Sequence, residues 1–197
     1  MTLKKVEKPT REQAEDAVRT LIRWAGDDPT REGLLDTPAR VAKSYSELFA
    51  GYEQNPEEIL HRTFKEVEGY DEMIVLRDIH FNSHCEHHMV PFTGSVHIAY
   101  IPTNKVVGLS KLARLVDIYA HRLQIQEKFT AQIANTLSDI LKPQGVAVVV
   151  QATHMCMTMR GVKKPAGVMQ TSKLLGLFRS DPRTRQEFFS LLKLQTP

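Results

Sequence analysis

The chain has 197 residues, of which 42% are apolar, and 26 Lys and Arg against 23 Asp and Glu give a formal net charge of +3. This length and apolar content suit a globular chain with a substantial core. Charges of both signs are interspersed, so their balance indicates neither a nucleic acid nor a membrane surface as partner. No stretch approaches the roughly 20 consecutive apolar residues of a membrane span, and we expect a cytosolic protein.

Two helices are predicted within the first 50 residues. Residues 11–25 carry apolar side chains at helical spacing and are followed by a Gly-Asp-Asp-Pro stop. Asp36 is expected to cap a second helix, and Asn55-Pro56 opens a short third one. We expect residues 1–69 to form an N-terminal helical extension.

From residue 70 the apolar pattern alternates between strand and helix periodicity. The order is two strands, two helices, two strands and a terminal helix. Ser110 is expected to cap the first of these helices, and Asp181-Pro182 starts the last. The predicted strands cover residues 73–76, 95–101, 146–150 and 168–178, and the two central helices carry apolar stripes over residues 112–123 and 129–141.

The two cysteines, Cys85 and Cys156, each lie one to three residues from a histidine. In a reducing compartment this spacing favours metal ligation, and a disulfide is the less favoured alternative. A Cys-x-x-His spacing lets a thiolate and an imidazole reach one ion from a single turn, and Cys156 can supply a second thiolate. Three ligands leave the fourth position of tetrahedral zinc for water, as in catalytic sites. Spacing alone does not decide which histidine is the third ligand.

Two further histidines are candidates for a role next to the proposed metal site. His87 and His154 lie within two residues of a proposed ligand, and imidazole titrates near neutrality, so both are candidate acid-base groups. Either could instead close a structural zinc site with a fourth ligand. For His80, His97 and His121 we expect no catalytic role.

Three separate segments carry recognisable motifs: Ser83-x-Cys85-Glu86-His87-His88, the run from Ala120 to Thr130, and Thr153-His154-x-Cys156-x-x-x-Arg160-Gly161. They resemble the signatures of the type I GTP cyclohydrolase family, and the resemblance covers nearly the whole chain. The chain departs from the family pattern at His84 and Phe129, neither of which is a proposed catalytic group.

The resemblance implies hydrolysis of GTP to formate and 7,8-dihydroneopterin triphosphate, the first step of tetrahydrofolate or other pterin biosynthesis. It assigns one zinc ion per subunit to Cys85, His88 and Cys156, where zinc would activate water for attack at carbon 8 of guanine. His87 would protonate the imidazole nitrogen as the ring opens. His154 would assist opening of the ribose ring.

Substrate contacts are also implied. Ser110 resembles the family's serine near the ribose hydroxyls, and Glu127, with Gln126 beside it, resembles the guanine reader, since one carboxylate can accept both N1–H and the exocyclic amine. The alternative is that Glu127 only favours the start of a helix. No glycine-rich phosphate loop is present, so cationic side chains must hold the triphosphate. The resemblance assigns that role to Arg40, Lys43, Lys111, Arg114 and Arg160, each of which is otherwise an ordinary surface charge.

The family's fold is the α+β tunnelling fold. It implies a four-stranded antiparallel sheet with two helices on one face in residues 70–197, followed by a C-terminal helix. Unpaired sheet edges favour ring assembly, and the resemblance implies a homodecamer of two pentameric rings. The competing classes are a zinc-stabilised interaction module and another zinc-dependent purine hydrolase. A deaminase is disfavoured, because the chain has no Cys-x-x-Cys motif.

Overall fold

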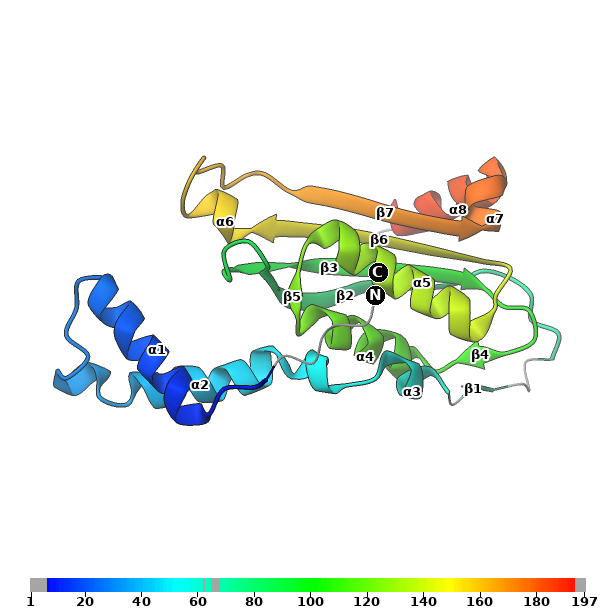
Figure 1. Ribbon diagram of the computed structural model, residues 1–197. Helices are drawn as coiled ribbons and strands as arrows, with labels where there is room; N and C mark the ends of the chain where they lie inside the picture. The colour runs from blue at the N-terminus through cyan, green and yellow to red at the C-terminus, as the bar shows by residue number, and fades with distance from the viewer. Residues whose placement is uncertain (1–6, 62, 65–67, 194–197) are drawn as a thin grey trace. The chain divides into compact units, whose positions relative to one another are not determined.

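The computed structural model describes residues 7–61, 63–64 and 68–193 (Figure 1). Contacts divide the chain into two compact units, one ending at Ala50 and the other beginning at Gly51. The expected division between residues 69 and 70 stays a prediction. No helix in the described part of the chain is long and apolar enough to cross a bilayer.

The elements follow the predicted order of helices, strands, helices, strands and a final helix. Within the described residues, the helices are α1 (Arg11–Trp24), η1 (Glu32–Leu34), α2 (Thr37–Leu48), η2 (Ala50–Glu53), α3 (Pro56–Leu60), α4 (Leu109–Ala120), α5 (Gln126–Leu141), α6 (Met155–Thr158), α7 (Leu177–Ser180) and α8 (Pro182–Lys193). The strands are β1 (Thr63–Phe64), β2 (Ile74–Cys85), β3 (Pro91–Ile101), β4 (Val106–Val107), β5 (Leu123–Gln124), β6 (Gly145–His154) and β7 (Met169–Gly176).

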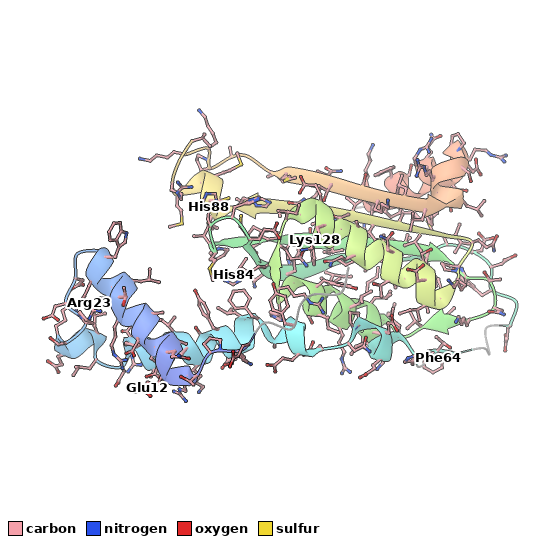
Figure 2. The ribbon with its side chains drawn as sticks, in the orientation of Figure 1. Glu12, Arg23, Phe64, His84, His88 and Lys128 are labelled. Carbon is pink, nitrogen blue, oxygen red and sulfur yellow. The ribbon has the colours of Figure 1, made fainter. Side chains whose placement is uncertain are left out.

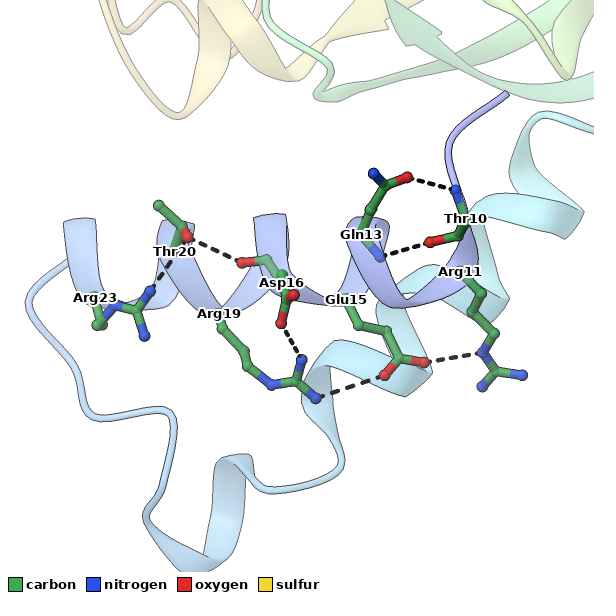
Figure 3. Close-up of polar contacts among 8 residues, drawn as sticks. All are labelled: Thr10, Arg11, Gln13, Glu15, Asp16, Arg19, Thr20 and Arg23. Atoms are coloured by element: carbon green, nitrogen blue, oxygen red, sulfur yellow. Dashed lines mark hydrogen bonds and ion pairs between the residues drawn. The ribbon is translucent and has the colours of Figure 1, made fainter. Parts of the chain in front are cut away.

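Local polar contacts define α1 (Figure 3). Thr10 Oγ1 accepts a hydrogen bond from the Gln13 backbone N–H at 3.2 Å, and Gln13 Oε1 accepts one from the Thr10 backbone at 2.8 Å. This reciprocal pair is a capping box. Along the helix, Glu15 pairs with Arg11 at 2.9 Å and with Arg19 at 3.6 Å. No residue of α1 is buried, so its position in the sequence follows from these local signals.

The residues predicted at helix starts agree with the structure to different degrees. Asp36 is the N-cap residue of α2, as predicted, but its side chain makes no capping hydrogen bond, and its carboxylate accepts one from Arg40 at 3.0 Å. Ser110 lies inside α4, which begins one residue earlier after the N-cap Gly108 and has no side-chain cap. The predicted Asn55 cap of α3 is confirmed, since Asn55 Oδ1 accepts from the backbone N–H two residues on at 3.0 Å.

The main sheet has the strand order β5-β2-β3-β6-β7 (Figure 1). Its four long strands are antiparallel neighbours, as predicted, and the two-residue β5, which was not predicted, pairs in parallel with β2. β2 continues far beyond the predicted residues 73–76, past a register shift between Leu76 and Ile79 where Asp78 has a φ of 58°. Such a bulge interrupts the alternation from which a strand is predicted.

Both faces of the central strands are covered over part of their length. α4 and α5 pack on one face, as predicted, and bury residues such as Ile98 and Val148. On the other face Phe178 of α7 and Phe188 of α8 pack against Val149 and neighbouring strand residues. Strands buried on both sides are uniformly apolar, which explains the run over residues 146–150.

Candidate functional site

The signature segments converge where β2 and β6 end. Both strands flank β3 and run antiparallel to it, so their last residues meet near its start: His84 pairs with Pro91, and His154 pairs with Phe92. Cys85 is the last residue of β2, and α6 follows β6 directly. Figure 2 shows His88 at this end of the sheet.

A tight turn after β2 presents the histidines. The Cys85 carbonyl accepts from the backbone N–H of His88 at 3.4 Å and of Met89 at 2.8 Å. Met89 has a φ of 54°, which closes the turn. The Glu86 backbone N–H donates to the Gln124 carbonyl at 2.9 Å, so the short strand β5 holds the turn in place.

Cys85, His88 and Cys156 form a candidate metal cluster. Their ligand atoms lie within 4.8 Å of one another, with Cys85 Sγ 3.9 Å from His88 Nδ1. Over the described ranges no other such group of three occurs, and His87, whose Nδ1 is 3.8 Å from Cys85 Sγ, is not part of it. Tetrahedral zinc at about 2.3 Å from sulfur and about 2.0–2.1 Å from nitrogen separates its ligand atoms by roughly 3.5–3.8 Å. The observed spacing fits zinc after small side-chain movements.

Both cysteines of the cluster are free thiols, so the less favoured disulfide is not formed. Cys85 is buried and Cys156 is half-buried. Burial, and then the neighbouring Cys85, raise the pKa of the Cys156 thiol, while the Arg160 charge lowers it. A divalent cation between two sulfurs favours the thiolates, so metal binding would release protons here.

The His154 ring is held from two sides. It stacks on Phe92 with ring centroids 4.6 Å apart and planes within 1°. Its Nε2 lies 2.8 Å from Gln126 Oε1. Burial lowers the pKa of His154, and the Glu127 carboxylate partly offsets this. The environment thus favours a neutral imidazole in a fixed orientation.

Gln126 and Glu127 open α5 but face different surroundings. Gln126 is 1% exposed, and its Nε2 donates to the carbonyls of Val150 and Met169 at 3.1 Å each. Glu127 is exposed and lies in the first helical turn. Consecutive helical residues point about 100° apart, which separates the two environments. The exposed carboxylate is free to meet a ligand, and its position in the first turn also agrees with the helix-start alternative.

Comparison with known proteins gives the family. The family profile described as GTP cyclohydrolase I matches residues 14–193. The chain belongs to the GTP cyclohydrolase I family. A protein named GTP cyclohydrolase 1, from Sinorhizobium fredii (strain NBRC 101917 / NGR234), is 55% identical over 186 residues, which cover 94% of this chain and 91% of that protein.

Two solved structures are similar over about half of the chain. An archaeosine synthase QueF-Like in the apo form has a TM-score of 0.45 at 17% identity and covers 53% of this chain and 93% of its own. The E. coli dihydroneopterin aldolase in complex with neopterin has a TM-score of 0.38 at 9% identity and covers 51% of this chain and 98% of its own.

The residues that the GTP cyclohydrolase I resemblance assigns to the ribose and triphosphate lie on several elements. Ser110 and Arg114 are exposed one turn apart on α4, with the half-buried Lys111 between them. Arg160 is exposed after α6, close enough to act on the Cys156 thiol. These assignments stay predictions.

Arg40 and Lys43 belong to α2 in the first compact unit, which is described by itself. Both are exposed, and Arg40 pairs with Asp36 at 3.0 Å. Exposed ion pairs of this kind are weak, so Arg40 can exchange its partner for a phosphate at little cost. Their assignment to the triphosphate stays a prediction.

Phe92, Thr130 and Thr171 also support the candidate site, and sequence reasoning missed them. Phe92 stacks on His154, and the two threonine hydroxyls lie 2.6 Å apart behind Gln126. None carries a titratable or metal-binding group, so even Thr130, the last residue of a signature segment, gave no sign of a role. Strand register brings Phe92 beside His154 and Thr171 beside Val150, and the packing of α5 adds Thr130.

Proposed function

We propose that this chain hydrolyses GTP to formate and 7,8-dihydroneopterin triphosphate, as the first step of tetrahydrofolate or other pterin biosynthesis. The observation that carries the proposal is the cluster of Cys85, His88 and Cys156, in a chain that belongs to the GTP cyclohydrolase I family. Two thiolates and one imidazole suit zinc and leave one coordination position open. Zinc bound there would activate water for attack at carbon 8 of guanine.

Proton transfer is proposed for the side chains around the cluster. His87, exposed on the turn beside His88, would donate a proton to the guanine imidazole nitrogen as the ring opens. His154, held neutral by burial, would accept a proton during opening of the ribose. Ser110 would relay a proton at the ribose hydroxyls.

Substrate recognition is proposed for charged groups. Glu127 presents an exposed carboxylate that also acts on the pKa of His154, so it lies close to the proton-transfer group. One carboxylate can accept both N1–H and the exocyclic amine of guanine. The triphosphate would be held by cations, since Arg gives bidentate contacts to phosphate and Lys a compact charge. These are Arg40, Lys43, Lys111, Arg114 and Arg160.

The test is incubation of the zinc-loaded protein with GTP, followed by assays for formate and for a fluorescent pterin after oxidation. We expect both products in equal amounts. ATP is the matched control, because adenine presents an acceptor at N1 where guanine presents a donor, and it should give neither product. The absence of formate and pterin from GTP would rule out the proposed activity.

We also propose that the chain assembles as a homodecamer of two pentameric rings. In the described sheet β7 is an edge strand, and edge strands expose unpaired backbone groups unless another chain covers them. We also propose a cytosolic location, because the thiols of Cys85 and Cys156 remain reduced there and can bind the metal. Light scattering should give a mass about ten times that of the 22.4 kDa chain. A fully active monomer would contradict the assembly.

A further inference from the structure

A continuous series of hydrogen bonds runs behind the candidate site to His154. Thr130 Oγ1 donates to the Gln126 backbone carbonyl at 2.7 Å, and Thr171 Oγ1 lies 2.6 Å from Thr130 Oγ1. Gln126 Nε2 lies 3.2 Å from Thr171 Oγ1, and Gln126 Oε1 lies 2.8 Å from His154 Nε2. Gln126 and Thr130 are almost completely buried, so their polar atoms depend on these partners.

The direction of each bond in this series is determined. A hydroxyl has one hydrogen, and Thr130 gives its hydrogen to a backbone carbonyl, which can only accept. Thr130 must therefore accept from Thr171. Thr171 Oγ1 also lies 3.2 Å from Gln126 Nε2, but the two hydrogens of that nitrogen already match the carbonyls of Val150 and Met169, so this contact is secondary. The carbonyls of Val150 and Met169 likewise require a donor, so the Gln126 atom that faces them is the amide nitrogen.

The tautomer of His154 follows from this orientation. With the amide nitrogen of Gln126 directed at β6 and β7, the amide oxygen faces His154, and an amide oxygen can only accept. The imidazole Nε2 must then carry a hydrogen, and Phe92 fixes the ring plane by stacking. No described residue forms a hydrogen bond with Nδ1 of this ring.

We propose that Gln126 is a positioning residue that selects the His154 tautomer with its proton on Nε2 and leaves Nδ1 as the proton acceptor for substrate. Gln126 is 1% exposed and both ends of its amide are used, so it acts through His154 and does not contact guanine. Guanine recognition is left to Glu127. The catalytic part of this inference rests on the proposed function, whereas the tautomer is a property of the protein without substrate.

Neutron diffraction from deuterium-exchanged crystals of the zinc-loaded protein, without GTP, reads the tautomer directly. We expect a deuteron on His154 Nε2, none on Nδ1, and two deuterons on the Gln126 amide nitrogen on the side of Val150 and Thr171. A deuteron on Nδ1, or the reverse amide orientation, would overturn the assignment. This result does not depend on turnover, so it stands apart from any failure of the proposed activity.

A double-mutant cycle tests whether Gln126 acts through His154. Gln126→Met removes the acceptor at similar volume, and we expect a loss of at least about tenfold in kcat with KM for GTP changed by less than about twofold. Added to His154→Ala, the same change should cost less than about twofold more, because the partner is already gone. Additive losses, or a raised KM, would instead indicate substrate contact and contradict the proposal. Zinc content and thermal unfolding identify the folded variants.

A milder pair of variants covers the case in which Gln126→Met fails to fold. Thr171→Val removes the hydroxyl that donates to Thr130 and contacts the Gln126 amide nitrogen, and we expect kcat to fall about threefold or more. Thr136→Val is the matched control on α5, since it removes a hydroxyl 2.7 Å from Tyr119 Oη outside this series. It should leave kcat unchanged. Equal kcat values for the two variants would overturn the role assigned to the series.

Discussion

The two halves of β6 differ in burial and in role. Residues 145–150 are buried on both faces, between α5 on one side and Phe178 and Phe188 on the other. Beyond them burial is no longer continuous: Gln151 is exposed, Ala152 is buried, and the strand ends at the half-buried His154 beside the metal cluster. The first half of β6 thus contributes to the core, and its last residue contributes to the candidate site.

This division has a physical cause. Polar and titratable groups lose free energy when they are buried without partners, so a reactive site has to lie where water and substrate can reach it. Its groups must still be held in place, and side chains on rigid elements are held more firmly than those on loops. His154 satisfies both needs, because it is the half-buried last residue of a strand whose other end is buried.

The largest effect should follow removal of a metal ligand at the open end. Cys85→Ala, His88→Ala and Cys156→Ala should each lower bound zinc well below one ion per subunit and abolish pterin formation, because two ligands hold zinc poorly. Elemental analysis and the pterin assay measure both. His80→Ala, at an exposed histidine of β2, is the control and should keep zinc and activity. Full zinc retention in all three ligand variants would exclude the proposed site.

A substitution in α8, which packs against the buried half of β6, should lower stability without changing zinc binding. Phe188 is fully buried against Phe178, so Phe188→Ala should lower the free energy of unfolding by about 3–5 kcal/mol. Chemical denaturation at fixed protein concentration measures it. Zinc per folded subunit should stay at the wild-type level. Loss of zinc from the folded protein would show that the two halves are coupled.

Sequence reasoning succeeded for the fold where the signals are local. Asn55-Pro56 and the apolar run over residues 146–150 predicted α3 and β6, because capping and burial act within a few residues. It failed for β5, which exists only through pairing with β2. The cap expected at Ser110 failed because serine suits several positions near a helix start, and α4 begins one residue earlier, after Gly108. Asp36 does occupy the N-cap position of α2, but its carboxylate bonds Arg40 and not the helix backbone.

For the candidate site, spacing predicted that the two cysteines and one histidine meet, and the family resemblance selected His88 as that histidine. The structure brings Cys85, His88 and Cys156 together although the last lies 68 positions beyond His88 in the sequence. The sequence did not predict that the neighbouring residues Gln126 and Glu127 differ in burial, one being buried and the other exposed. They depend on which side of α5 packs on β6 and β7, which is a long-range property of the fold.

The guanine-reading role of Glu127 gives the next smaller effect. Glu127→Gln keeps the volume but presents a donor to guanine donors, so turnover efficiency for GTP should fall at least about tenfold, as for the loss of a charge-assisted bond of about 1.5–3 kcal/mol. Zinc content and oligomer size should stay normal. Asp139→Asn, which removes another exposed charge of α5, should leave kinetics unchanged. Near wild-type efficiency for Glu127→Gln would leave only the helix-start role.

The smallest effect should come from His97, a titratable group on β3 opposite Val149 of the buried half. Its Nδ1 accepts from the Asp78 backbone N–H at 3.2 Å, which requires that nitrogen to be unprotonated. Burial lowers the pKa of His97, Asp78 raises it, and Arg77 lowers it further.

The lowered pKa of His97 makes stability depend on pH. The unfolded chain binds the proton more readily than the folded chain, so the contribution of neutral His97 to stability is complete above about pH 6.5. It is lost as the pH falls toward the folded pKa. One group contributes at most about 1.4 kcal/mol per pH unit. His97→Asn retains an acceptor without the titration, so its unfolding free energy should depend less on pH below about 6.5. Parallel wild-type and variant profiles would remove His97 from this account.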